Sequence, residues 1–337
     1  TADWLETLLG RVPAGVSRVR LQLLLPNLLL RTGDFSRARE FASQALEEAD
    51  KLLEPVLQIE ALYILSIACE LQGRMDEGFE MVQRAKALNA IDEEPYFGVR
   101  LDVASSTFLK FDGAIESSIE TLEQAKESAM RINDHRIQAT ILNNLGAIYT
   151  DLGRFESAES AYLGAKVIYE QLHDQRAKAI LLNNISILMK RQERLIECLD
   201  YAHQAITLTK EIGNPLNAAI FSGNLGLTLC EDNEPIDAEP YLTQAIDECD
   251  EFSHPASGAF RSVLAMILGD RDEFVEARKL LAYGEQQLRG VHTFQLGLLL
   301  ARRAIIEVKA GAPKQAEAAL TEAESIAQQL GASEDSE

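Results

Sequence analysis

Basic residues are few and dispersed in this sequence of 337 residues. Its 32 Lys and Arg are outnumbered by 53 Asp and Glu, which gives a net charge of −21, and the longest basic run is the pair Arg302-Arg303. A surface that binds phosphate groups needs clustered cations. The sequence therefore argues against nucleic acid and anionic membranes as partners. The acidic charge is interpreted as a solvated outer face, with a specific basic partner as the alternative.

Cysteines and long apolar runs are also scarce. The longest apolar run, residues 21–30, is interrupted by Pro26 and is too short to span a bilayer. No two cysteines have the CxxC spacing of a metal or redox site. They are predicted to be small core residues of a protein in a reducing, cytoplasmic compartment rather than a disulfide framework. The four are Cys69, Cys198, Cys230 and Cys249.

No known catalytic pattern occurs in the sequence. There is no HExxH, no glycine-rich loop before a lysine and no GxSxG. The histidines are spread along the chain, too far apart for a ligand set: His135, His173, His203, His254 and His292. Nothing supplies a nucleophile together with a base and an orienting group. We therefore expect a non-catalytic protein that needs no metal or cofactor.

What the sequence does contain is a repeat. The segment Asn143-Asn144-Leu145-Gly146 returns after about 40 residues as Asn183-Asn184-Ile185-Ser186, and again as Gly223-Asn224-Leu225-Gly226. Two columns of small residues keep the same step over eight copies, as expected where helices cross closely. One column is Ala38, Gly78, Ser118, Ala158, Cys198, Ala238, Ala277 and Ala316; the other is Ala45, Ala85, Ala125, Ala165, Ala205, Ala245, Gly284 and Ala323.

Each copy has the pattern of two amphipathic helices joined by a short turn. In the fourth copy the helices are predicted at 136–152 and 155–171, with Gly153 in the left-handed conformation between them. Asp134 and Asp174 are placed to cap the helices that follow them. No segment alternates with period two, so the predicted fold is all-α, a solenoid of eight helix pairs.

The predicted domain organisation has three parts. Residues 1–15 form a capping helix or the remnant of a preceding repeat, residues 16–331 form the eight repeats, and residues 332–337 are an acidic tail. Because the chain starts without Met, we expect it to be a domain of a larger protein.

The residues of the fourth copy carry a family resemblance. In order they are Leu145, Gly146, Tyr149, Gly153, Phe155, Ala158, Tyr162 and Ala165. This order resembles the tetratricopeptide repeat (TPR) signature, in the extended form of about 40 residues found in kinesin light chains and bacterial signalling proteins. The resemblance implies a right-handed superhelix whose first helices line a concave groove. In the first copy Pro26 occupies the early small position and is expected to kink the helix.

The opening residues 4–9 followed by repeats resemble a second group. In large bacterial regulators, a signal-transduction ATPase or a kinase precedes a TPR-like sensor arm. That resemblance implies that this chain receives a signal while another domain acts.

The asparagines are the first candidate binding residues. In the fourth copy the buried stripe is expected at Leu142, Leu145, Tyr149 and Leu152, which leaves Asn143 and Asn144 outside it. By resemblance these positions, with Asn183, Asn184 and Asn224, face the groove. An amide can pair with the backbone of an extended peptide. The alternative is a ladder of Asn side chains that bond to one another and brace the stack.

Two cations lie near the asparagines in sequence. Lys190 and Arg191 are at the end of the same predicted helix as Asn183 and Asn184, and are expected to place positive charge beside the ladder. They could receive a carboxylate or an acidic peptide. The alternative is ordinary charge pairing with Asp151 and Glu231.

The leading functional hypothesis is therefore a peptide- or protein-binding module, the sensor or scaffold arm of a bacterial signalling or transcription regulator. Two hypotheses of other classes stay open: a small-molecule receptor with a pocket between helices, and a scaffold that assembles through its ends or its convex face.

Overall fold

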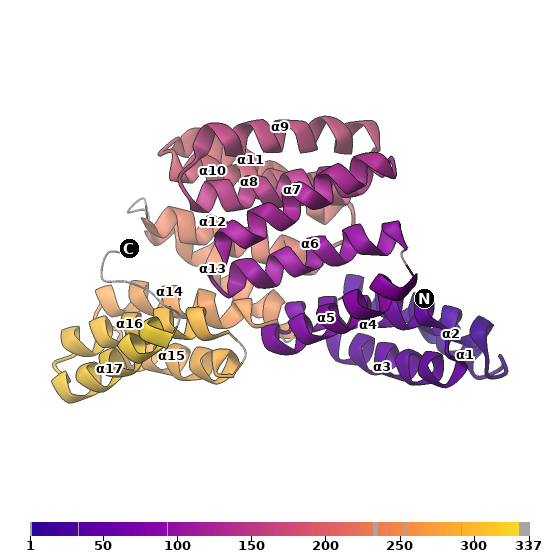
Figure 1. Cartoon of the computed structure of the whole chain (residues 1–337). Coiled ribbons are helices and arrows are strands. Elements are labelled where there is room, and N and C mark those ends of the chain that lie inside the picture. Colours follow the sequence, from indigo (N-terminus) through magenta and orange to yellow (C-terminus); the bar gives the residue numbers. More distant parts are fainter. Residues whose placement is uncertain are drawn as a thin grey trace. The chain divides into compact units, whose positions relative to one another are not determined.

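The computed structural model describes residues 2–32, 34–92, 94–231, 235–252, 254–290 and 292–329 (Figure 1). The chain divides into two compact units, residues 1–201 and 202–337. The described residues form helices and turns without a strand, as predicted. The predicted acidic tail, residues 332–337, lies outside the described residues.

The helices follow one another in the order α1 (Ala2–Leu9), α2 (Val16–Thr32), α3 (Phe35–Leu52), α4 (Pro55–Leu71), α5 (Met75–Asp92), α6 (Pro95–Phe111), α7 (Ile115–Arg131), α8 (His135–Asp151), α9 (Phe155–Gln171), α10 (Gln175–Arg191), α11 (Leu195–Glu211), α12 (Pro215–Glu231), α13 (Pro235–Glu251), α14 (Ala256–Asp270), α15 (Phe274–Leu288), α16 (Thr293–Lys309) and α17 (Pro313–Gln329). From α2 onward they alternate as first and second helices of pairs, which confirms the predicted fold of TPR-like helix pairs. The division between the two units falls within α11.

The turns inside the pairs are built as the sequence indicates. Gly153 adopts a φ of 68° after α8, a left-handed conformation that glycine enters without a Cβ clash. In the turns between pairs, carboxylates cap the first helices α8 and α10: Asp134 Oδ1 accepts a hydrogen bond from the Ile137 amide at 2.9 Å, and Asp174 Oδ1 accepts one from the Ala177 amide at 3.1 Å. Tight turns and caps of this kind keep the two helices of a pair antiparallel and adjacent.

The small residues are the closest points of helix packing. Both predicted columns are buried wherever the structure describes them. Gly146 shows why one position must be small: a Cβ placed there would lie 2.5 Å from Cε1 of the buried Tyr162 ring. The aromatic ring of α9 thus occupies the space above the glycine of α8, which fixes the spacing of the pair.

Two details differ from the predictions. Leu152, expected in the buried stripe, is 38% exposed, because α8 ends at Asp151 and Leu152 belongs to the turn. Asn143, expected outside the stripe, is buried, because it faces the first helix of the next pair. Pro26 lies inside α2, which continues on both sides of it.

The first helices pack against one another in succession. In the first unit α2 contacts α4, α4 contacts α6, α6 contacts α8, and α8 contacts α10. In the described residues no comparable packing joins α3 to α5, α5 to α7, or α7 to α9. Because the stack is tighter along its first helices, it bends toward them. We call the partly exposed side of α2, α4, α6, α8 and α10 the inner face of the first unit.

Candidate functional site

The asparagines of α8 and α10 meet on the inner face. Asn184 Nδ2 donates a hydrogen bond to Asn143 Oδ1 at 3.0 Å, across 41 residues of sequence. Asn143 is 8% exposed and Asn183 is 6% exposed, whereas Asn144 and Asn184 are partly exposed. One rung of the ladder therefore exists between these two helices. Each Asn pair has one buried member and one partly exposed member.

Asn224 belongs to the second unit. It lies in α12, partly exposed, and its backbone carbonyl accepts a hydrogen bond from Thr228 Oγ1 at 3.1 Å. The structure thus brings together the asparagines of α8 and α10, and it places Asn224 in a separate compact unit.

The two cations lie at the C-terminal end of α10. Lys190 is partly exposed and Arg191 is exposed. At 1.5 Å per residue they lie about 9 Å along the helix axis from Asn184. Asp151, a predicted partner for them, pairs with Lys110 of α6 at 2.6 Å. Charge pairing on this face therefore links α6 to α8.

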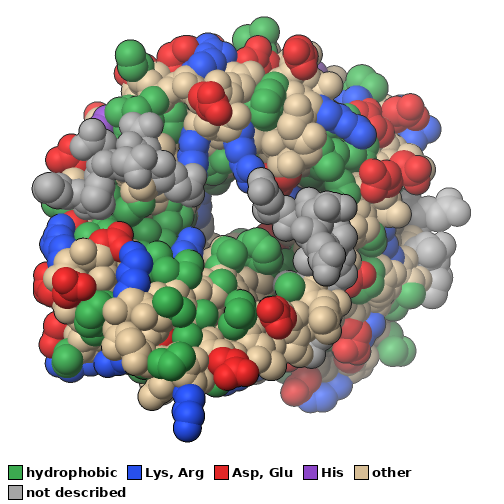
Figure 2. Space-filling view, turned by 90° about the vertical axis from the view of Figure 1, so that its left-hand side faces the viewer, with side chains coloured by type: hydrophobic (Ala, Val, Ile, Leu, Met, Phe, Trp, Pro, Cys, Tyr) green, Lys and Arg blue, Asp and Glu red, His purple; other side chains and the backbone are tan. Residues whose placement is uncertain are grey.

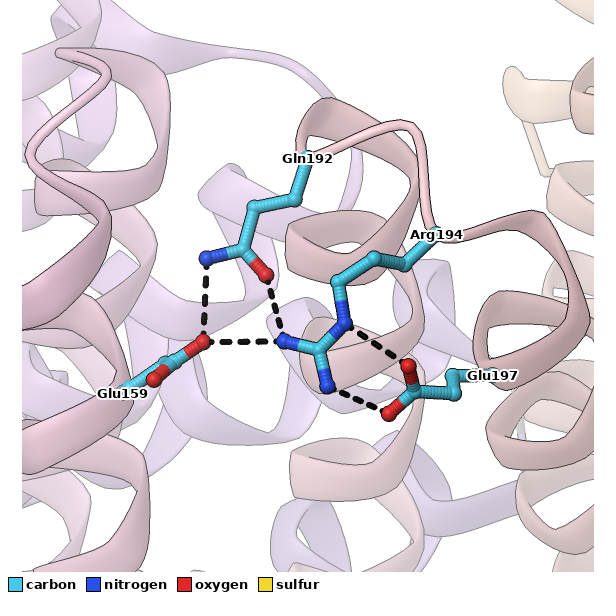
Figure 3. A network of polar contacts seen from close by, with 4 residues as sticks. All are labelled: Glu159, Gln192, Arg194 and Glu197. Carbon is cyan, nitrogen blue, oxygen red and sulfur yellow. Dashed lines mark hydrogen bonds and ion pairs between the residues drawn. The ribbon is translucent and has the colours of Figure 1, made fainter.

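An exposed polar network braces the turn after α10 (Figure 3). Arg194 Nε donates to Glu197 Oε1 at 2.8 Å, and Arg194 Nη1 donates to Glu159 Oε1 at 3.1 Å and to Gln192 Oε1 at 2.8 Å. The hydrogen bond with Glu197 raises the pKa of Arg194, and the same bond lowers the pKa of Glu197. The side chains satisfy one another across α9 and the next pair, so we assign this network to bracing rather than to a ligand.

Charge is distributed unequally between the two kinds of helix. In the first unit the first helices α2, α4, α6, α8 and α10 contain ten Lys and Arg against four Asp and Glu. The second helices α3, α5, α7 and α9 contain eight Lys and Arg against 15 Asp and Glu. The acidic balance of this unit is therefore carried by its outer helices, while its inner helices are basic.

On the face shown in Figure 2, the described residues form no large area of one kind of side chain. Acidic, basic and hydrophobic side chains are interspersed on it in small groups. In the described part of the chain, no group of three His, Cys, Asp or Glu residues is arranged to hold a metal ion. None of the described helices combines the length and the hydropathy of a membrane span.

Sequence reasoning missed a cluster on α4 and α6. The Arg100 guanidinium carbon lies 4.2 Å from the ring centroid of Tyr63 and 5.2 Å from that of Tyr96, and Nη1 donates to the Tyr96 hydroxyl at 3.3 Å. Burial raises the pKa of Glu60, while first Arg100 and then Arg20 act to lower it. The 40-residue spacing of Arg20, Glu60 and Arg100 was visible in the sequence. The stacking on tyrosines was not, because Tyr63 and Tyr96 stand at different repeat positions.

A second inner-face carboxyl group is affected by burial. Glu70, at the end of α4, has a pKa raised to about 7. A carboxyl with that pKa is only partly ionised at neutral pH. Burial of Glu70 therefore makes the inner face less negative than its sequence suggests.

The sequence of one repeat matches a known family. Residues 138–176 match the family model of the tetratricopeptide repeat, and they contain most of α8, all of α9 and the start of α10. No protein of curated function matches the chain in sequence.

Solved structures resemble the fold over most of the chain. A Rap protein complexed with competence and sporulation factor has a TM-score of 0.71 at 13% identity, over 95% of this chain and 88% of that one. NprR in complex with its cognate peptide NprX has a TM-score of 0.65 at 16% identity, over 98% and 92%.

A signal-transduction ATPase with a tetratricopeptide repeat sensor, from Pyrococcus horikoshii, has a TM-score of 0.59 at 14% identity, over 88% of this chain. The match covers 50% of that larger protein. Residues 138–176 thus match one tetratricopeptide repeat in sequence, and the packing of the helix pairs gives the chain a TPR-like fold.

Proposed function

We propose that the chain is a non-catalytic peptide-binding module and that a peptide binds across its inner face. The observation that carries the proposal is the pairing at α8 and α10. The hydrogen bond from Asn184 to Asn143 uses one N–H of Asn184 and leaves its carbonyl, its second N–H and the Asn144 amide on the partly exposed side. A peptide backbone offers alternating donors and acceptors that such amides can meet.

The structural neighbours support this reading. Rap was solved with competence and sporulation factor, and NprR with its cognate peptide NprX. A third carries its repeats as the sensor of a signal-transduction ATPase. We infer that the present module is the sensor or scaffold arm of a larger bacterial signalling or transcription-regulating protein and that another domain of that protein produces the output.

A binding experiment with the whole chain tests the proposal. Random peptides displayed on phage are selected against the chain, and the selected peptides are measured by fluorescence anisotropy. Asn144→Ala and Asn184→Ala should each weaken binding about tenfold, the effect of losing a hydrogen bond of about 1.4 kcal/mol. Gln124→Ala, an exposed amide on outer helix α7, should leave the affinity unchanged.

The outcomes separate the binding role from the bracing role. If no peptide is selected, or if the Asn144 and Asn184 variants bind as tightly as the wild type, the proposed groove site is wrong. Equal weakening by Gln124→Ala would show that the peptide lies elsewhere.

A further inference from the structure

We propose that Arg100, held by Tyr63 and Tyr96, is an anchor for a carboxylate of an acidic peptide on the inner face of the first unit. This inference rests on the proposed function and gives its ligand a chemical class. The anchor lies on α4 and α6, apart from the asparagines of α8 and α10.

Several other inner-face cations already have carboxylate partners. Lys110 pairs with Asp151 at 2.6 Å, Arg18 pairs with Glu48 at 3.6 Å, and Arg136 pairs with Asp174. Arg100 is different. Its contacts in the described part of the chain are the two tyrosines and a longer-range attraction to Glu60, without a carboxylate in ion-pair contact.

The tyrosines orient the guanidinium in advance. A cation over an aromatic ring is attracted by the negative face of the ring, and stacking keeps the planar group in one orientation. Nη1 donates to the Tyr96 hydroxyl, and the N–H groups of Nε and Nη2 have no hydrogen-bond partner in the described part of the chain. A fork of N–H donors fits a carboxylate in two-point contact. Because the side chain is already ordered, a ligand loses little side-chain entropy on binding.

The surroundings favour an anion at this position. Arg20 and Arg100 lie on either side of Glu60 in successive first helices, so the row contains two cations and one carboxyl group. Tyr96 also lines a surface hollow with Asp134, His135 and Arg136 at the start of α8. Through Tyr96 the anchor therefore borders the start of α8, and the partly exposed Asn144 lies about two turns further along that helix.

The test uses short random peptides in three fluorescent pools, in which the charged residues are only Asp and Glu, only Lys and Arg, or absent. Anisotropy with the whole chain should show the acidic pool bound at least about tenfold more tightly than the other two. Raising the salt concentration should weaken that binding. Amidation of the peptide C-terminus separates the two sources of the carboxylate: unchanged affinity assigns a side chain, and lost affinity assigns the terminal carboxylate.

Variants then locate the anchor. R100Q should weaken acidic-pool binding about tenfold, and R100K should fall between R100Q and the wild type because a lysine keeps the charge without the planar fork. E60Q should tighten the binding, a gain that misfolding cannot produce. R84Q removes an exposed arginine from outer helix α5 and should change nothing. Far-UV circular dichroism verifies the fold of each variant.

Two different failures are distinguishable. If basic or neutral peptides bind as tightly as acidic ones, or if R100Q and E60Q bind like the wild type, the carboxylate anchor is wrong while peptide binding stands. If none of the pools binds, the proposed function fails and the anchor fails with it.

Discussion

The hydrogen bond between Asn184 and Asn143 allows bracing to be measured separately from binding. In Asn184→Ala the side-chain carbonyl of Asn143, a residue that is 8% exposed, loses its donor. A buried acceptor without a partner costs about 1–3 kcal/mol. The higher helix propensity of alanine offsets about 0.5 kcal/mol of this loss in stability. The expected net loss in the free energy of unfolding is therefore about 0.5–2.5 kcal/mol.

Asn144→Ala provides the reference for this measurement. Asn144 is partly exposed on α8, so its replacement should retain the gain in helix propensity without leaving a buried acceptor unpaired. We expect Asn144→Ala to be neutral or more stable by about 0.5 kcal/mol. The two substitutions should thus change stability in opposite directions, although both are expected to weaken peptide binding.

Urea unfolding followed by far-UV circular dichroism measures these differences, provided that the variants share the slope of free energy against urea concentration. A double-mutant cycle of Asn143→Ala and Asn184→Ala should give a coupling energy of about 1 kcal/mol. A coupling indistinguishable from zero, with Asn184→Ala as stable as Asn144→Ala, would refute the assignment of this hydrogen bond as a brace between the two pairs.

Two further predictions concern packing and pH. Gly146→Ala should destabilise the chain by about 1–3 kcal/mol in urea unfolding, because the new Cβ meets the Tyr162 ring. Gly164→Ala is the control: its Cβ meets only the flexible end of Leu142, so the change should be neutral or stabilising. Equal effects of the two substitutions would contradict this explanation. Burial, and then His292, lower the pKa of His254 to about 4, so its neutral form is favoured in the folded state. The contribution of His254 to the free energy of unfolding, up to about 3 kcal/mol, should be present above pH 6.5 and lost as the pH falls toward 4. His254→Asn should remove that part of the pH dependence of unfolding.

Much of the fold could be predicted from the sequence because the repeat restates the same packing requirement eight times. The columns through Ala158 and Ala165 revealed the helix crossings, and Asp134 and Asp174 revealed the helix starts. Turn positions were less visible where glycine is replaced: Glu193 adopts a φ of 59° at the position equivalent to Gly153. Nothing in a single glutamate signals a left-handed conformation, since the position is fixed by the helices on either side.

The candidate site was only partly predictable. Periodicity within one helix placed Asn143 outside the buried stripe, but it cannot show that the next pair covers that position. The same limit applies to Arg100, whose orientation depends on Tyr63 of a different helix. Contacts between repeats decide both cases, and a pattern read along one helix does not contain them.

The spacing of successive first helices in the first unit also sets the distance between equivalent contacts along a bound ligand. Packed helices lie about 8–10 Å apart. A chain in polyproline II conformation repeats its side-chain direction every three residues, which corresponds to roughly 9 Å. A peptide lying across α4, α6, α8 and α10 in that conformation would present every third side chain to successive repeats. Its recognition sequence should then have a period of three, with the residues between facing solvent and free to vary.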